Sequence, residues 1–284
     1  MHFADALTAR TKQTSPVCVG LDPRLPKLPA KISKGPAGVL TFNKGIIDAV
    51  KDIASSVKIN LAFFEVLGWE GMKVFWETCA HAKAQGLIVI ADGKRGDIGS
   101  TCEAYADAYL FPESPVDALT VNPYLGSDGI APFIERCTKH EKGIFVLVKT
   151  SNQSSEELQD LPTGNEAVHE HLAQLVESWA TVGARHGVPL QGSQTNLSCV
   201  GAVVGATYPE ELTYLRTLMP HCPFLIPGYG TQGGTAKDVK RGFLPDGTGA
   251  IVNASRSITE ASSGEDWQEA TRRATEEMAS ALRS

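Results

Sequence analysis

The segment 92–98, with the sequence DGKRGDI, places one lysine between two aspartates directly after the apolar run Leu87–Ala91. Asp92 and Lys94 are two positions apart, so on an extended backbone both side chains point to the same side. Lys94 between the carboxylates of Asp92 and Asp97 stays protonated, because opposite charges favour the charged form. Such a lysine can deliver a proton to a carbanion. The alternative is a surface salt-bridge cluster, which we disfavour because the segment follows an apolar run and not a helix face.

Two further charged residues fit the same site. Asp22 ends the apolar run Val17–Leu21, and Lys58 lies inside the run Val57–Ile59. A lysine in an apolar strand is costly to bury unless it is paired, and Asp92 or Asp22 could pair with it. The alternative is a lysine at a strand end whose ammonium reaches solvent. The other charges at strand ends favour the site.

A glycine-rich segment, residues 227–234 (PGYGTQGG), and the segment 253–256 (NASR) form the second signal. Glycines such as Gly228 and Gly230 let the backbone approach an anion closely, and the helix expected after them offers free N–H groups. Gln232 in the first segment, with Ser255 and Arg256 in the second, adds polar groups, and a guanidinium can bind two phosphate oxygens. Together the segments predict a phosphate site.

Short apolar runs alternate with longer amphipathic segments eight times, which indicates parallel strands covered by helices. Eight such units predict a (β/α)₈ barrel, in which the active site lies at the carboxyl ends of the strands and phosphate often lies after strands seven and eight. An open doubly wound sheet is the rival, but residues 20–23 (GLDP) lack its G-x-G-x-x-G turn. The expected strands are Val17–Leu21, Val57–Ile59, Leu87–Ala91, Ala118–Val121, Ile144–Val148, Cys199–Val204, Phe224–Ile226 and Ala250–Val252.

The helical segments lie between these strands, and no linker or repeat divides the chain. We therefore expect one domain over residues 1–284, with an insertion at about 151–198 near the mouth of the barrel. The expected helices are Gly38–Val50, Gly68–Gln85, Ser100–Leu110, Ser127–His140, Glu166–His186, Pro209–Leu218, Thr235–Arg241 and Asp266–Leu282.

Polar residues also follow the fourth and fifth expected strands. Asn122 follows one, and Ser151 and Asn152 follow the other. At a barrel mouth their hydroxyl and amide groups suit the edge of a polar base such as a pyrimidine. The alternative is turn or helix-capping chemistry, which for Asn152 is at least as good an explanation.

Composition excludes several classes of protein. A formal net charge of −6 argues against a nucleic-acid binder, and the sequence has neither an apolar run long enough for a membrane span nor a signal peptide at residues 1–10. The six cysteines are scattered, which predicts reduced thiols in a cytoplasmic protein. No metal motif appears: His169 and His171 lack the H-E-x-x-H spacing, and we expect a solvated helix face there. The four tryptophans are expected to pack.

The segment D-x-K-x-x-D-I at 92–98 resembles the signature of the orotidine 5′-phosphate decarboxylase family. The resemblance extends from residues 19–22 (VGLD) to 253–256. Residues 149–152 (KTSN), 204–209 (VGATYP) and 227–230 (PGYG) are similar to the longer bacterial group, which carries an insertion after the fifth strand. The resemblance implies a barrel enzyme that converts orotidine 5′-phosphate to uridine 5′-phosphate in pyrimidine synthesis without a cofactor or metal.

The resemblance also implies roles for residues of this chain. Lys94 would protonate C6 of the pyrimidine, while Asp92 would face the substrate carboxylate. Asp97 and Thr101 would enter the site of a neighbouring subunit, which requires a homodimer with shared sites. The residues implied in substrate contact are Asp22 and Lys58 at the ribose, Ser151 at the pyrimidine, and Gln232 and Arg256 at the phosphate.

Two other functions compete with this interpretation. A metal-dependent sugar-phosphate lyase or decarboxylase on a similar barrel shares the D-x-K-x-x-D motif but places a metal-binding carboxylate in the second strand. This chain has Lys58 there, which leaves Glu65 as the best candidate ligand. A non-catalytic nucleotide-phosphate binding protein would keep the glycine-rich segment and Arg256 but would not need the alternating charges.

Overall fold

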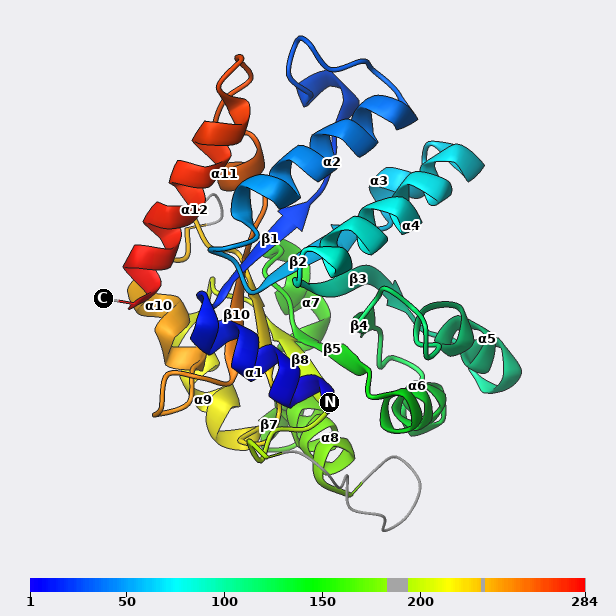
Figure 1. The fold of residues 1–284 in the computed structure, drawn as a ribbon. Helices are drawn as coiled ribbons and strands as arrows, with labels where there is room; N and C mark the ends of the chain where they lie inside the picture. Colours follow the sequence, from blue (N-terminus) through cyan, green and yellow to red (C-terminus); the bar gives the residue numbers. More distant parts are fainter. Residues whose placement is uncertain (183–193, 231–232, 284) are drawn as a thin grey trace.

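Eight parallel strands close into a barrel in the order β1-β2-β3-β4-β5-β8-β9-β10 (Figure 1). This computed structural model describes residues 1–182, 194–230 and 233–283. The eight predicted strands are all present, so the (β/α)₈ barrel is confirmed. Their bounds are β1 Val17–Leu21, β2 Ser56–Asn60, β3 Ile88–Arg95, β4 Ala118–Val121, β5 Gly143–Lys149, β8 Val200–Val204, β9 Phe224–Pro227 and β10 Ala250–Ala254.

Helices surround the barrel, and their apolar faces pack against the outward side chains of the strands (Figure 1). Most predicted helices are confirmed to within two residues, whereas α1, α3, α7 and α11 were not predicted. Within the described residues, no helix is both long and apolar enough to cross a membrane. The helices are α1 Phe3–Gln13, α2 Pro36–Val50, α3 Ala62–Glu65, α4 Gly68–Ala84, α5 Gly99–Tyr109, α6 Ser127–His140, α7 Glu156–Gln159, α8 Val168–Val182, α9 Pro209–Leu218, α10 Ala236–Val239, α11 Arg256–Thr259 and α12 Trp267–Arg283.

The inward side chains change from apolar to polar along several strands, among them β3. Ile88 and Ile90 of β3 belong to an apolar cluster inside the barrel, and the next inward position is Asp92. The same alternation turns Lys58 of β2 and Thr120 of β4 inward. Helix α1 contributes Phe3 and Leu7 to this interior cluster, so the apolar end of the barrel is covered and the polar end remains for the site.

The insertion between β5 and β8 differs from its prediction. A helix was expected over Glu166–His186, but α8 begins at Val168, and residues 183–186 lie outside the described part of the chain. The start differs because Glu166–Ala167 (β7) pair with Pro162–Thr163 (β6) in a short antiparallel hairpin. The one-turn helix α7 precedes this hairpin.

The prediction that all four tryptophans pack is wrong for one of them. Trp69 at the start of α4 is 76% exposed. The other three do pack: Trp179 is buried, Trp76 stacks on Tyr109 at 5.8 Å between ring centroids, and Trp267 lies against a phenylalanine of α2.

Candidate active site

Asp92 is the centre of a buried polar network at the carboxyl ends of β2, β3 and β4. Its Oδ2 accepts a hydrogen bond from Nζ of Lys58 at 2.6 Å, and its Oδ1 accepts one from Nζ of Lys94 at 2.7 Å. The hydroxyl of Thr120 also donates to Oδ1, at 2.9 Å. Asp92 and Lys58 are buried, whereas the side chain of Lys94 is 50% exposed and faces open space.

The charges in this network hold one another ionised. Burial alone would raise the pKa of Asp92, but the ammonium groups of Lys58 and Lys94 bring that pKa well below its usual value. Burial would likewise lower the pKa of Lys58, yet the carboxylates of Asp92 and Asp22 raise it above its usual value. The site therefore presents two fixed positive charges bound to one carboxylate, and either lysine can act on an anionic substrate.

Lys94 reaches Asp92 through an unusual backbone conformation. Its φ is 47°, in the left-handed region that non-glycine residues rarely adopt, and the β3–β4 register shifts between Ala91 and Arg95. The N–H of Lys94 donates to the hydroxyl of Thr120 at 2.9 Å, which holds this turn. We predicted that the two side chains would meet on a regular extended segment. They do meet, but through a bulge that aims the ammonium at the carboxylate.

A cavity of about 540 Å³ opens beside this network at the carboxyl ends of the strands. Its walls combine five charged residues with polar groups from the segment after β5, the insertion and β10. One wall atom, Oδ1 of Asp22, is buried without a hydrogen-bond partner within the described residues. The lining residues are Asp22, Lys58, Asp92, Lys94, Thr120, Leu147, Thr150, Ser151, Asn152, Gln159, Val203, Leu225, Pro227, Gly228, Tyr229, Asn253, Ala254, Ser255 and Arg256.

The end of the cavity beside β9 and β10 is suited to an anion. Gly228 and Gly230 both have positive φ, and the N–H of Gly234 donates to the carbonyl of Gly228, so the loop is a tight turn. Gly228 and Arg256 line the cavity, while Gly230 lies just outside its wall. Arg256 is exposed and forms no ion pair with any described residue, which leaves its guanidinium available to a ligand.

Two expectations for this loop change. Gln232 lies outside the described residues. The helix after the loop, α10, was expected to offer free N–H groups to an anion, but it has a single turn, and the N–H groups of Thr235 and Asp238 at its start are bound by side chains of the same two residues. Thr235 accepts from the N–H of Asp238, and the Asp238 carboxylate accepts from the N–H of Thr235.

Besides Gly230, three predicted site residues do not line the cavity of a single chain. Asn122 is exposed, and its amide oxygen accepts the N–H of Tyr124 at 3.0 Å, so the turn chemistry that we gave as its alternative describes it better. Asp97 accepts the N–H of Ile98 at 2.8 Å. Thr101 is exposed on α5. Within the described residues no ion pair joins Asp97 to Lys94, so the expected lysine between two aspartates has only one of them in its own chain.

A family model described as "Orotidine 5′-phosphate decarboxylase / HUMPS family" matches residues 15–273. The chain belongs to this family. It is 45% identical to an orotidine 5′-phosphate decarboxylase of Rhodopirellula baltica over 303 residues, which covers 98% of each chain. It is also similar to the solved structure of Leishmania donovani OMP decarboxylase, with a TM-score of 0.80 at 34% identity over 100% of both chains. It matches Leishmania donovani UMP synthase with a TM-score of 0.81 and 36% identity, but covers only 57% of that longer chain.

Its similarity to the Rhodopirellula protein over nearly the full length of both places the chain with the longer decarboxylases of this family. The geometry also weakens the metal-dependent alternative. Glu65, its best candidate ligand, forms an ion pair with Arg95 and does not line the cavity. In the second strand, where that alternative needs a carboxylate, the ammonium of Lys58 contacts Asp92.

Several cavity residues of this decarboxylase-family chain were not predicted. Thr120 binds both Asp92 and Lys94. The sequence feature that could have predicted it is a polar residue at an inward position of an otherwise apolar strand. Thr150 and Gln159 line the wall from β5 and the insertion, and Asn253 donates to the carbonyl of Cys18 at 3.1 Å. Gln159 could not be found from spacing, because it comes from a segment with no regular pattern.

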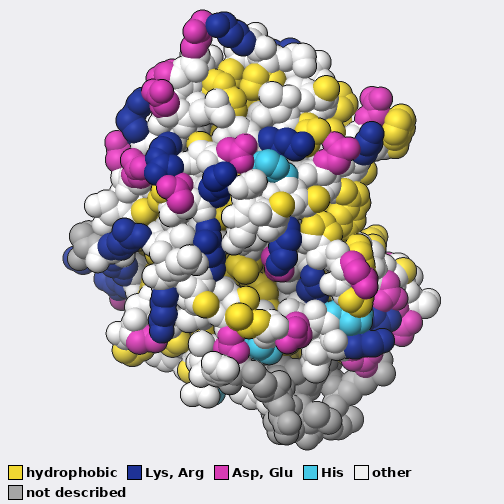
Figure 2. All heavy atoms as spheres, in the orientation of Figure 1, with side chains coloured by type: hydrophobic (Ala, Val, Ile, Leu, Met, Phe, Trp, Pro, Cys, Tyr) yellow, Lys and Arg dark blue, Asp and Glu magenta, His cyan; other side chains and the backbone are white. Residues whose placement is uncertain are grey.

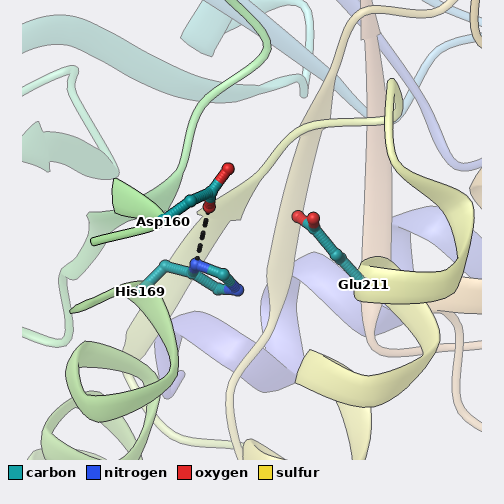
Figure 3. A group of neighbouring side chains, drawn as sticks. All are labelled: Asp160, His169 and Glu211. Atoms are coloured by element: carbon teal, nitrogen blue, oxygen red, sulfur yellow. Dashed lines mark ion pairs between the residues drawn. The ribbon is translucent and has the colours of Figure 1, made fainter. Parts of the chain in front are cut away.

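The prediction of a solvated face for His169 and His171 is wrong for the first of them. His169 is buried, whereas the side chain of His171 is more than half exposed. Figure 3 shows His169 pointing to Asp160, with Glu211 across from both, and Nδ1 of His169 lies 3.1 Å from Oδ1 of Asp160. Asp160 and His169 belong to the insertion, and Asp160 forms an ion pair with Lys149 at the end of β5.

Proposed function

We propose that this protein decarboxylates orotidine 5′-phosphate to uridine 5′-phosphate in pyrimidine synthesis. The observation that carries the proposal is Asp92 bound between Lys58 and Lys94 in the wall of the cavity, together with family membership. The ionised carboxylate of Asp92 repels the carboxylate of the substrate. The ammonium of Lys94 stabilises the negative charge that develops when carbon dioxide leaves.

The chemistry requires one proton and no redox step. The bond between C6 of the pyrimidine and the carboxylate carbon breaks, carbon dioxide leaves, and the electron pair stays on C6. Lys94 then transfers a proton from Nζ to C6, which gives uridine 5′-phosphate and a neutral amine that solvent reprotonates. The half-exposed side chain of Lys94 has room for this transfer, while buried Lys58 stays paired with Asp92.

Substrate binding occupies the rest of the cavity. Oδ1 of Asp22 is buried without a partner among the described residues, and it accepts a hydrogen bond from a ribose hydroxyl. Lys58 links the ribose to Asp92. Gly228 and Arg256 hold the 5′-phosphate, with Gln232 and Ser255 from the same loops. Binding energy at the phosphate, far from C6, contributes to the lowering of the barrier.

We further propose a homodimer in which Asp97 and Thr101 complete the partner's site. Support comes from apolar side chains that are exposed in the single chain around the ends of β2, β3 and β4. Figure 2 shows hydrophobic side chains gathered near α4 on this side of the molecule. A stable dimer would bury them. They are Val66, Trp69, Ile98, Tyr124 and Leu125, exposed by 78, 76, 57, 79 and 47%.

We assign the protein to the cytoplasm. All six cysteines are free and buried, and thiols persist in a reducing compartment.

The test is the loss of orotidine 5′-phosphate absorbance on addition of the purified protein, with and without EDTA. We expect equal rates in both conditions and uridine 5′-phosphate as the product. Activity that EDTA abolishes would favour the metal-dependent alternative. Binding of the nucleotide without turnover would instead favour a binding protein and would contradict the proposal.

A further inference from the structure

The insertion returns to the end of β5 and joins it through two successive residue pairs. Asp160 forms an ion pair with Lys149, the last residue of β5. The neighbouring residue, Gln159, binds Thr150 twice: its Oε1 accepts the N–H of Thr150 at 2.9 Å, and its Nε2 donates to the Thr150 hydroxyl at 2.8 Å. The insertion is thus fixed to the start of the segment that carries Ser151.

The ion pair anchors this junction through a buried lysine and a partly exposed aspartate. Lys149 is fully buried, lies 3.6 Å from Glu211 Oε2, and has its ammonium 4.9 Å from the centre of the Tyr208 ring. Asp160, His169 and Glu211, drawn in Figure 3, bring their ligand atoms within 4.8 Å of one another, as a metal site would. The ammonium of Lys149 already contacts both carboxylates, so the positive charge at this place belongs to the protein.

The side chain of Gln159 faces the cavity and not the ion pair of Lys149 with Asp160. Gln159, Thr150, Ser151 and Asn152 are all part of the cavity wall. The Thr150 hydroxyl, which accepts from Gln159, donates in turn to Oδ1 of Asn152 at 2.6 Å. One amide therefore sets the orientation of the backbone and hydroxyl at position 150 and, through them, the segment 150–152.

The position of this wall indicates which part of the substrate it meets. Arg256 and Gly228 suit the phosphate, and Asp22 with Lys58 suits the ribose. Besides Asn253 and Tyr229, the polar wall that remains is the segment 150–152 with Gln159. We propose that Gln159 is a positioning residue that holds this segment against the pyrimidine, an inference that rests on the proposed function.

The experiment compares two probes that share the ribose phosphate but differ in the base. For Gln159→Ala we expect affinity for uridine 5′-monophosphate to fall about tenfold, because two hydrogen bonds that order the wall are lost. Affinity for ribose 5-phosphate should stay within about twofold of wild type. With orotidine 5′-phosphate, KM should rise with a smaller change in kcat. Glu157→Gln, an exposed residue on the same helix α7, is the matched control and should change none of these values.

Equal losses for both probes, or no loss for either, would overturn the inference. If Gln159→Ala does not fold, Thr150→Val tests the same link, since it removes the hydroxyl that Gln159 binds but keeps the N–H. The same selective loss for the base-bearing probe is then expected, and its absence would count against the inference. A wild-type protein that binds uridine 5′-monophosphate but does not decarboxylate orotidine 5′-phosphate would refute the proposed function and leave this binding comparison intact.

Discussion

Lys94 is the proposed proton donor, and its position depends on an unusual backbone conformation. Its ammonium is one of two that hold Asp92 ionised, but its side chain is half-exposed, whereas that of Lys58 is buried. Its left-handed backbone is a local cost, of order 1–3 kcal/mol, that the bulge in β3 and the hydroxyl of Thr120 sustain. Strain of this kind is typical of a side chain that must be aimed accurately.

Lys94→Ala should abolish turnover while the fold survives, because the proton donor is lost and Lys58 still neutralises Asp92. The measurement is kcat on orotidine 5′-phosphate, with circular dichroism to confirm folding. A variant that keeps more than about a tenth of wild-type activity, a loss under roughly 1.4 kcal/mol in barrier, would be incompatible with a proton-donor role.

Arg256→Ala should mainly weaken binding, because its guanidinium has no ion-pair partner among the described residues and lines the anion end of the cavity. The loss in kcat/KM should be about 10²-fold or more for orotidine 5′-phosphate, since a charged hydrogen bond is worth ~1.5–3 kcal/mol and two can form. Phosphate-free orotidine serves as the comparison and should be nearly unaffected. Equal losses for both substrates would remove Arg256 from the phosphate site.

At the scale of elements, the carboxyl ends of the strands carry the site because inward positions alternate along each strand. Lys58, Asp92 and Thr120 continue the inward rows of β2, β3 and β4, and these rows meet because the strands are neighbours. The insertion then adds a wall that no barrel strand provides. It is attached at the end of β5 through the pairs Lys149–Asp160 and Thr150–Gln159.

Asp160→Ala should destabilise the protein by about 2 kcal/mol, because it leaves the fully buried ammonium of Lys149 with the longer contact to Glu211 as its remaining ion pair. The free energy of unfolding from urea titration measures this change. Glu156→Ala, an exposed residue of α7, is the control and should stay within about 0.5 kcal/mol of wild type. A similar stability for both variants would show that Lys149 does not depend on Asp160.

At the scale of the whole molecule, the single chain leaves a group of exposed apolar side chains, from Val66 to Leu125, and Asp97 around the ends of β2 to β4. Lys94 has one carboxylate from its own chain. A second carboxylate supplied by a partner, as the proposed dimer requires, would complete the expected arrangement of a lysine between two aspartates.

A mixture of Asp97→Ala and Lys94→Ala subunits should recover activity that neither parent has. In a mixed dimer one site carries both substitutions and the other carries neither. With random exchange about half of the dimers are mixed and half of their sites are intact, so about a quarter of wild-type activity should return if the sites are independent. Activity at the level of the parents, with subunit exchange demonstrated by mass spectrometry, would show that Asp97 acts within its own chain.

The sequence by itself determined the barrel and the charged centre of the site. Eight apolar runs of strand length were sufficient because parallel strands covered on both faces must be apolar throughout. Asp22, Lys58, Asp92 and Lys94 could be assigned to one site because strand ends in a closed barrel converge, whatever the details of the loops.

Only the tertiary structure decided the contacts that do not follow a periodic pattern. The pairing of Gln159 with Thr150 and of Asp160 with Lys149 depends on how an irregular insertion folds back, and local propensity does not encode that path. The exposure of Trp69 and the burial of His169 have the same origin, because a helix shows which residues share a face but not what covers that face. Asn122 likewise needed the actual turn, since one amide can serve either a ligand or its own backbone.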